Sequence, residues 1–234
     1  MSLGTLTRRS FMVGAVVVGA GAVFGTYEVL RPSPNPLAPE GDTVFNPWLR
    51  IGPEGITVIV PRAEMGQGVT TTLAALVAEE LMVPLDAVRI EHGPPAEAYA
   101  NQALLMARGY DAEPETGPGA AIKAAVPKVM KLQITGGSTS TVDAFDKMRS
   151  AGAAAREVLL LAGADAAGVT LDKVRAENGA IVTADGQRLP YGVLAPRAAL
   201  FEMPRAPRLK APADWTILGK SQLTVDGPAK ATGT

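Results

Sequence analysis

One stretch decides the fold of this chain, Arg62-Ala63-Glu64-Met65-Gly66-Gln67-Gly68-Val69-Thr70-Thr71-Thr72. It follows a short apolar run, residues 56–60, whose composition predicts a buried strand, and it precedes residues 73–81, whose apolar positions recur at helical spacing. A chain that turns from a strand through two glycines into a helix presents backbone N–H groups at the positive end of that helix. This geometry suits a phosphate or another anion. Glycines also turn a chain without binding anything, so the motif alone leaves both interpretations open.

A second predicted helix start repeats the pattern. Gly136-Gly137-Ser138-Thr139-Ser140 precedes a segment that is predicted to be helical to about Leu161. The expected N-caps are Thr141 or Asp143 here and one of the threonines at 70–72 in the first helix. The hydroxyl cluster can be a capping device alone. Two such starts in one domain also predict one elongated anion, such as a pyrophosphate-bearing cofactor, held between two helix N-termini.

Composition excludes several classes of function. Among 234 residues, 47% are apolar and 19% are charged, which is typical of one or two globular domains. The net charge of −1 argues against a nucleic-acid partner. The chain has no cysteine and a single histidine, His92, so it carries no disulfide, iron–sulfur cluster or cysteine nucleophile, and multi-histidine metal sites and a Ser-His-Asp triad are disfavoured. We assign no catalytic residue and no metal ligand, and expect redox chemistry to depend on a bound organic cofactor or on another chain.

The N-terminus has the pattern of an export signal. Thr7-Arg8-Arg9-Ser10-Phe11-Met12 places paired arginines ahead of an uncharged, glycine-containing run, as in twin-arginine signals. Residues 11–30 are also close to the ~20 residues that span a bilayer, so a membrane anchor is the alternative. We therefore expect a periplasmic protein exported by the twin-arginine route, with the leader either cleaved or retained in the inner membrane.

The remaining patterns predict an α+β fold with a mixed sheet, two long helices packed on it, an N-terminal signal or anchor helix and an extended C-terminal tail. Hairpins are expected around residues 52–55 and through Asn178-Gly179, with a further strand at 86–92. The predicted divisions are a signal or anchor at 1–30, a proline-rich linker at 31–47, the main α+β domain at 48–202, and at 203–234 a linker with the start of a further domain.

Three assignments concern individual segments. Residues 96–131 have no clear periodicity, so we expect loops and small residues that form a functional or partner-facing excursion. Glu79 and Glu80 lie near the end of the first predicted helix, where the helix dipole does not favour them, and are interpreted as a solvated edge rather than a catalytic pair. His92, at the end of a strand, is interpreted as a structural residue.

Several ordered motifs together resemble a known family. They are Glu64-Met65-Gly66-Gln67-Gly68, Leu76-Val77-Ala78-Glu79-Glu80-Leu81, Thr135-Gly136-Gly137-Ser138-Thr139-Ser140, Ala151-Gly152-Ala153-Ala154-Ala155-Arg156-Glu157 and the closing Asp226-Gly227-Pro228-Ala229-Lys230. The chain resembles the molybdopterin-binding subunit of the xanthine dehydrogenase and aldehyde oxidase family. The resemblance is strongest to its exported branch, which includes the beta subunit of isoquinoline 1-oxidoreductase and membrane-bound aldehyde dehydrogenases.

This resemblance implies molybdopterin cytosine dinucleotide as the cofactor. In such proteins the Gly-Gln-Gly loop and the serine-rich loop bind the cofactor, which assigns cofactor binding here to Gly66, Gln67, Gly68, Gly137, Ser138, Thr139 and Ser140. The resemblance further implies oxidation of an aldehyde or hydroxylation of an N-heterocycle with oxygen from water. Implied partners are a small [2Fe–2S] subunit and a membrane cytochrome c.

In that family the motif at residues 226–233 opens the next domain. The glycine-rich Gly-Gly-Phe-Gly motif and the C-terminal glutamate that acts as general base belong to the part that follows. We therefore expect this chain to be a natural half or a truncation of the subunit, to need the remainder of the subunit as a partner, and to be inactive alone. The alternatives are a non-catalytic, membrane-tethered binding or assembly module of the same fold and a remnant without function.

Overall fold

The computed structural model describes residues 19–21, 23, 26, 27, 31–39, 41–106 and 115–233. The expected signal segment at 1–30 lies mostly outside these residues. Within the part described, no helix is both long and apolar enough to cross a bilayer. The chain divides into two compact units, one made of residues 1–34 and 95–140, the other of residues 35–94 and 141–234.

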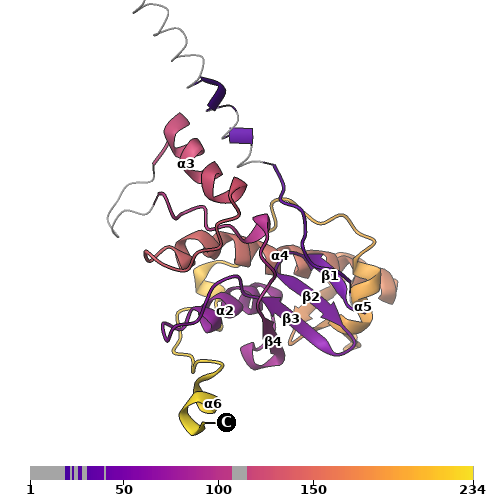
Figure 1. Cartoon of the computed structure of the whole chain (residues 1–234). Helices are drawn as coiled ribbons and strands as arrows, with labels where there is room; N and C mark the ends of the chain where they lie inside the picture. Colours follow the sequence, from indigo (N-terminus) through magenta and orange to yellow (C-terminus); the bar gives the residue numbers. More distant parts are fainter. Residues whose placement is uncertain are drawn as a thin grey trace, which may run out of the picture. The chain divides into compact units, whose positions relative to one another are not determined.

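The larger unit is built on a mixed four-stranded sheet with the order β1-β2-β3-β4 (Figure 1). Its strands are β1 (Thr43–Asn46), β2 (Leu49–Gly52), β3 (Gly55–Ile59) and β4 (Val88–Glu91). The first three are antiparallel, and β3 pairs with β4 in parallel. The predicted hairpin around residues 52–55 is confirmed, and β1 falls within the segment expected to be a linker.

The connection between β3 and β4 is a βαβ crossover. It contains helix α2 (Val69–Leu81) and a short 3-10 turn, η1 (Leu85–Ala87). The predicted helix is confirmed and begins four residues earlier than its apolar pattern indicated. Because the chain leaves the carboxyl end of β3 and enters α2, the N-terminus of α2 lies at the edge of the sheet where open α/β folds commonly bind ligands.

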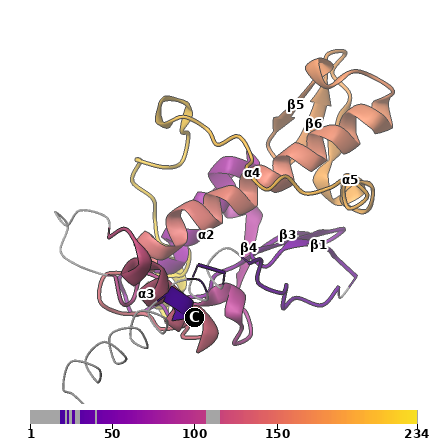
Figure 2. The same ribbon diagram turned by 90° about the horizontal axis from the view of Figure 1, so that it is seen from above.

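The second long helix, α4 (Ser140–Ala167), packs against α2 (Figure 2). It extends six residues beyond the predicted end and stops at Gly168, which has a φ of 66°, the left-handed conformation common after a helix end. Gly152 lies so close to α2 that a Cβ there would be 2.6 Å from the Val77 carbonyl oxygen. Both helices contribute to one apolar core with the sheet, including Leu49, Val58, Leu73, Leu76, Met148, Val158 and Leu159.

The far end of α4 carries a small antiparallel sheet of β5 (Val174–Glu177), β6 (Ala180–Thr183) and β7 (Arg188–Pro190), preceded by η3 (Leu171–Lys173) and followed by α5 (Tyr191–Ala198). The predicted hairpin is confirmed: Asn178 and Gly179 both have positive φ, 46° and 73°. Tyr191 is buried and donates a 2.9 Å hydrogen bond to the Leu81 carbonyl, which joins α5 to the end of α2.

After α5 the chain is irregular, with η4 (Pro212–Asp214) and a short helix, α6 (Gly227–Thr232). The smaller unit contains η2 (Glu97–Tyr99) and α3 (Pro118–Val129). The expectation that residues 96–131 form only loops is therefore wrong. Four of the twelve residues of α3 are alanines, which favour a helix but give little apolar periodicity, and Pro127 interrupts the pattern near the helix end.

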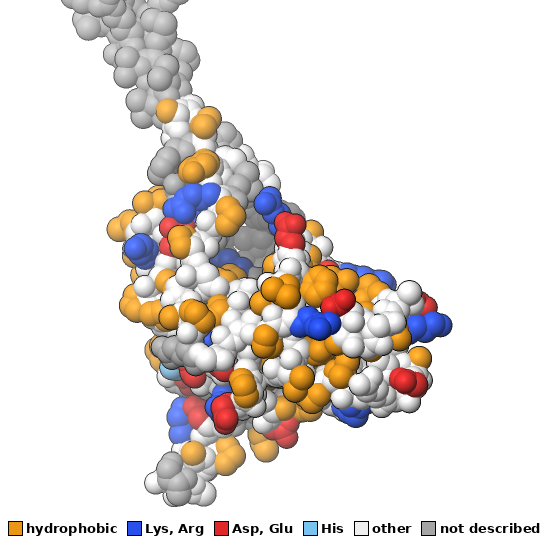
Figure 3. Space-filling view, turned by 90° about the vertical axis from the view of Figure 1, so that its right-hand side faces the viewer, with side chains coloured by type: hydrophobic (Ala, Val, Ile, Leu, Met, Phe, Trp, Pro, Cys, Tyr) orange, Lys and Arg blue, Asp and Glu red, His pale blue; other side chains and the backbone are white. Residues whose placement is uncertain are grey.

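The surface seen in Figure 3 carries hydrophobic, basic and acidic side chains interspersed with one another.

Candidate functional site

The glycine loop, residues 64–68, connects β3 to α2 and is exposed. Gly66 and Gly68 have φ values of 98° and 76°, and a Cβ at either position would meet no atom within 4 Å. Glycine is needed for the backbone conformation and not for lack of space. Gly68 is the N-cap residue and makes no side-chain cap. The prediction that a threonine at 70–72 caps α2 is wrong because these three residues lie inside the helix. There Thr72 Oγ1 donates a 2.9 Å hydrogen bond back to the Gly68 carbonyl.

Glu64 satisfies the amides that a threonine was expected to cap. Its Oε1 accepts hydrogen bonds from the backbone N–H groups of Gly66 at 2.8 Å and Gly68 at 3.0 Å, and its Oε2 accepts one from Thr70 at 3.0 Å. The pKa of Glu64 is lowered, chiefly by the Thr70 hydrogen bond; desolvation opposes this, and the amides of Gly68 and Gly66 add to it. A carboxylate therefore occupies the anion-binding position that the sequence predicted for a ligand.

The side chain of Gln67 folds back on its own loop. Its Oε1 accepts a 2.6 Å hydrogen bond from the Met65 amide, and its Nε2 donates a 2.9 Å hydrogen bond to the Ala63 carbonyl. The neighbouring Met65 is 69% exposed. Thr70 is buried at the start of α2, and its hydroxyl has no hydrogen-bond partner among the residues that the structure describes. Convergent amides and a buried hydroxyl are the kinds of donor that bind a phosphoryl group. They could do so here if the phosphoryl oxygens took the place of the Glu64 carboxylate.

A buried ion pair joins the entry of this loop to α4. Arg62 Nη2 lies 2.6 Å from Asp143 Oδ2, and their side chains are 1% and 3% exposed. Asp143 also binds Lys147, one turn later, at 2.7 Å. Asp143 thus lies within the first turn of α4 and is not its N-cap. Desolvation lowers the pKa of Lys147, while Asp143 opposes that effect.

The serine-rich loop, residues 136–140, lies in the smaller unit, which ends at Ser140. Gly137 and Ser138 are exposed and have φ values of 62° and 56°. Thr139 is buried, and its hydroxyl donates a 2.7 Å hydrogen bond to the Gly136 carbonyl. Ser140 begins α4. The structure therefore presents Gly137 and Ser138 at the surface and assigns Thr139 to the closure of the loop.

Asn101 is a residue of this loop region that the sequence analysis missed. Its side chain is fully buried, and its Nδ2 donates to Thr139 Oγ1 at 2.7 Å and to the Ile134 carbonyl at 2.9 Å. Its Oδ1 has no hydrogen-bond partner within the described part of the chain. Asn101 thus supports the loop from a position 35 residues before it, in a segment that lacked any pattern. The glycine loop and the serine-rich loop belong to different compact units, so the prediction that they hold one cofactor stays a prediction.

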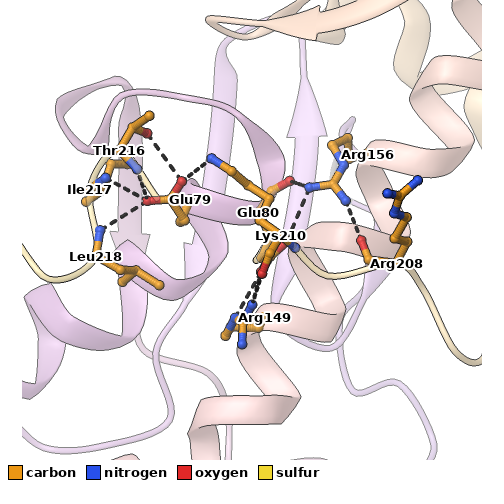
Figure 4. Close-up of polar contacts among 9 residues, drawn as sticks. All are labelled: Glu79, Glu80, Arg149, Arg156, Arg208, Lys210, Thr216, Ile217 and Leu218. Atoms are coloured by element: carbon orange, nitrogen blue, oxygen red, sulfur yellow. Dashed lines mark hydrogen bonds and ion pairs between the residues drawn. The ribbon is translucent and has the colours of Figure 1, made fainter. Parts of the chain in front are cut away.

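The interpretation of Glu79 and Glu80 as a solvated edge is wrong. They are 1% and 0% exposed. Donors from the segment after α5 surround Glu79, and donors from α4 together with the Lys210 amide surround Glu80 (Figure 4). Their buried carboxylates are engaged by these donors, which indicates a structural role. His92 also has a structural contact, with Nδ1 3.1 Å from the Val60 carbonyl oxygen.

Comparison with known proteins identifies the class. A family model described as a molybdopterin cofactor-binding domain matches residues 7–103, which include the glycine loop and α2. The chain is 33% identical to a membrane-bound aldehyde dehydrogenase (pyrroloquinoline-quinone) of Gluconacetobacter polyoxogenes, over 98% of this chain and 27% of that protein. It is 31% identical to the beta subunit of isoquinoline 1-oxidoreductase of Brevundimonas diminuta, over 81% of this chain and 22% of that protein. A solved structure of quinoline 2-oxidoreductase from Pseudomonas putida 86 matches 63% of this chain and 15% of that one, with 22% identity and a TM-score of 0.35.

Residues 7–103 therefore match a molybdopterin cofactor-binding domain. The chain is a relative of the molybdopterin-binding subunits of the xanthine dehydrogenase and aldehyde oxidase family, which confirms the resemblance drawn from its motifs. It spans about a quarter of the length of the two curated relatives.

Proposed function

We propose that this chain is the part of a molybdenum hydroxylase subunit that binds molybdopterin cytosine dinucleotide. The observation that carries the proposal is the convergence of three backbone amides at the N-terminus of α2, within the segment matched by the cofactor-binding family model. Three N–H groups that already hold a carboxylate are suited to hold a phosphoryl group.

The chain's own residues would bind and orient the cofactor. Gly66 and Gly68 supply backbone amides, and Gln67 supplies a carboxamide once it is released from its own loop. Gly137, Ser138, Thr139 and Ser140 are the proposed second contact, with the exposed Ser138 hydroxyl as a donor and Asn101 as the support of the loop. The cofactor, when bound, supplies the redox chemistry. Because the chain itself has no cysteine, a [2Fe–2S] cluster would lie on a partner.

The proposed reaction is oxidation of an aldehyde or hydroxylation of an N-heterocycle, in line with the names of the relatives. The proposed partners are the remainder of the molybdopterin-binding subunit, a small [2Fe–2S] subunit and a membrane cytochrome c. We further propose export to the periplasm by the twin-arginine route, on the basis of Arg8 and Arg9 ahead of an uncharged run.

Purification of the chain from its native host tests this function. The expected result is co-elution with a molybdenum-bearing polypeptide and aldehyde or N-heterocycle oxidation by the complex, with no turnover by the chain alone. A homogeneous, metal-free chain without partners would instead support a non-catalytic binding or assembly module of the same fold.

A further inference from the structure

The segment that follows α5 does not lead away from the larger unit. Residues 208–218, here called the strap, lie across the C-terminal half of α2 and the adjoining turns of α4 (Figure 4). Two adjacent carboxylates hold it, and neither has a role in the function proposed above.

Glu79 binds the end of the strap. Its Oε2 accepts hydrogen bonds from three consecutive backbone N–H groups, those of Thr216, Ile217 and Leu218, at 2.9, 2.6 and 3.0 Å. Its Oε1 pairs with the ammonium of Lys210 and accepts a bond from Thr216 Oγ1. Desolvation raises the pKa of Glu79, but the bonds from Lys210 and from the amides of Ile217 and Leu218 outweigh it, so that the net pKa is lowered.

Glu80 binds the beginning of the strap together with two arginines of α4. Its Oε1 accepts from Arg149 at 2.7 Å, and its Oε2 accepts from Arg156 at 3.2 Å and from the Lys210 backbone amide at 2.9 Å. The same arginines reach the strap directly, because Arg149 donates to the Lys210 carbonyl and Arg156 to the Arg208 carbonyl. Three cations thus surround two buried carboxylates, which satisfies charges that the helix C-terminus would otherwise disfavour.

The chain then returns to the opposite end of α2. The Val225 amide donates 3.0 Å to Thr71 Oγ1 in the first turn of α2. Lys230, on α6, pairs with Asp226 and also interacts electrostatically with Glu64, the residue that holds the loop amides. The segment held by Glu79 and the segment next to the glycine loop are therefore consecutive parts of one tail.

We propose that Glu79 and Glu80 are positioning residues of the ligand site, because by anchoring the strap they hold residues 225–230 beside the glycine loop. This inference rests on the function proposed above in placing the ligand at that loop. The tail then contributes the positive charge of Lys230 near the amides, where an anionic group would bind.

The distances along the chain agree with this coupling. Thr71 and Glu79 are eight residues apart on α2, or about 12 Å along the helix axis. Leu218 and Val225 are seven positions apart in the sequence, and an extended chain of that length reaches roughly 23 Å. The link is long enough to reach without strain and short enough that the anchor raises the effective concentration of residue 225 at Thr71.

Hydrogen exchange of the full chain, followed by mass spectrometry, tests the proposal. In Glu79→Gln, we expect peptides that contain residues 216–218 to exchange at least about tenfold faster, because three hydrogen bonds to a charged acceptor are weakened. Peptides that contain residues 64–71 and 225–230 should also exchange faster, while those of β5–β7 are unchanged. Thr71→Val should affect residues 225–230 and leave 216–218 protected. Glu157→Gln, which only weakens a single contact to the exposed Arg208 amide, should change little.

Faster exchange at 216–218 with no change at 64–71 and 225–230 would overturn the proposal, as would no change at all. If Glu79→Gln does not fold, Lys210→Met removes the cation on Glu79 and gives the same comparison. The exchange data need no ligand. A separate titration with inorganic pyrophosphate, followed at the Gly66 and Gly68 amide resonances, reports on the anion site: no binding by the wild type would count against the proposed function and leave the tail coupling to be judged by exchange alone.

Discussion

Arg62 and Asp143 form an ion pair of 2.6 Å between the loop that enters α2 and the first turn of α4, and both side chains are almost fully buried. The pair joins two segments that are 81 residues apart in the sequence. It fixes the first turn of α4 relative to the entry of the glycine loop.

Breaking this pair should be costly. Arg62→Met removes one of the two cations that contact the buried Asp143, and Asp143→Asn removes the carboxylate from the buried Arg62. Each should lower the free energy of unfolding by about 3–5 kcal/mol. The double variant should lose clearly less free energy of unfolding than the sum of the two single losses. Urea denaturation of the wild type, both single variants and the double variant measures this. Additive losses would show that the two residues act independently.

Gly152→Ala should destabilise the chain by about 1–3 kcal/mol, because the new Cβ would lie 2.6 Å from the Val77 carbonyl oxygen and force α2 and α4 apart. Gly119→Ala is the matched control, since Gly119 is also helical and its Cβ would meet no atom within 4 Å. Thermal unfolding of both variants measures the difference. Equal melting temperatures would contradict the close approach of the two helices.

Glu79 should make stability depend on acid pH. Its pKa in the folded chain lies below the ordinary 4.5, so its stabilising contribution is complete above about pH 4.5 and is lost as the pH falls through the lower, folded-state value. Glu79→Gln should therefore lower the free energy of unfolding by about 3 kcal/mol at pH 7. The difference in free energy of unfolding between the variant and the wild type should narrow as the pH is lowered toward 3. Urea unfolding at several pH values measures this gap; a gap that stays constant would contradict the assignment.

Glu64 should compete with an added anion. Glu64→Gln weakens the hold on the amides of Gly66, Gly68 and Thr70, so inorganic pyrophosphate should shift these amide resonances at lower concentrations than in the wild type. Glu91→Gln, which changes an exposed carboxylate on β4, is the control. A Glu64→Gln chain that binds no better, or worse, would show that Glu64 is a permanent clamp of the loop rather than a competitor.

Local sequence patterns predicted the elements that carry local signals. The strand at β3, the helix at α2 and the Asn178-Gly179 hairpin each follow from residues that are neighbours in the chain. The family resemblance followed in the same way from short ordered motifs.

The rest depended on contacts between distant residues. Glu79 is buried by Lys210, which is 131 residues away, and Asn101 supports Thr139 from 38 residues away. No local rule indicates such partners, so a charged pair near a helix end was interpreted as solvated. The capping role of Glu64 had a local signal, since an acidic residue just before a glycine-rich helix start is a possible cap. The neighbouring threonines had the stronger capping propensity and were therefore predicted instead.

The most direct test of the central claim compares two glycine variants of this chain, Gly66→Ala and Gly186→Ala, each purified with its partners from the native host. Both glycines have a φ above 90° and room for a Cβ, but only Gly66 belongs to the glycine loop. The measurement is molybdenum content together with cytidine monophosphate released by acid hydrolysis. We predict that the wild type and Gly186→Ala contain both in equal amounts and that Gly66→Ala loses most of each. A wild-type complex without molybdenum, or a Gly66→Ala complex as fully loaded as the control, would contradict the account.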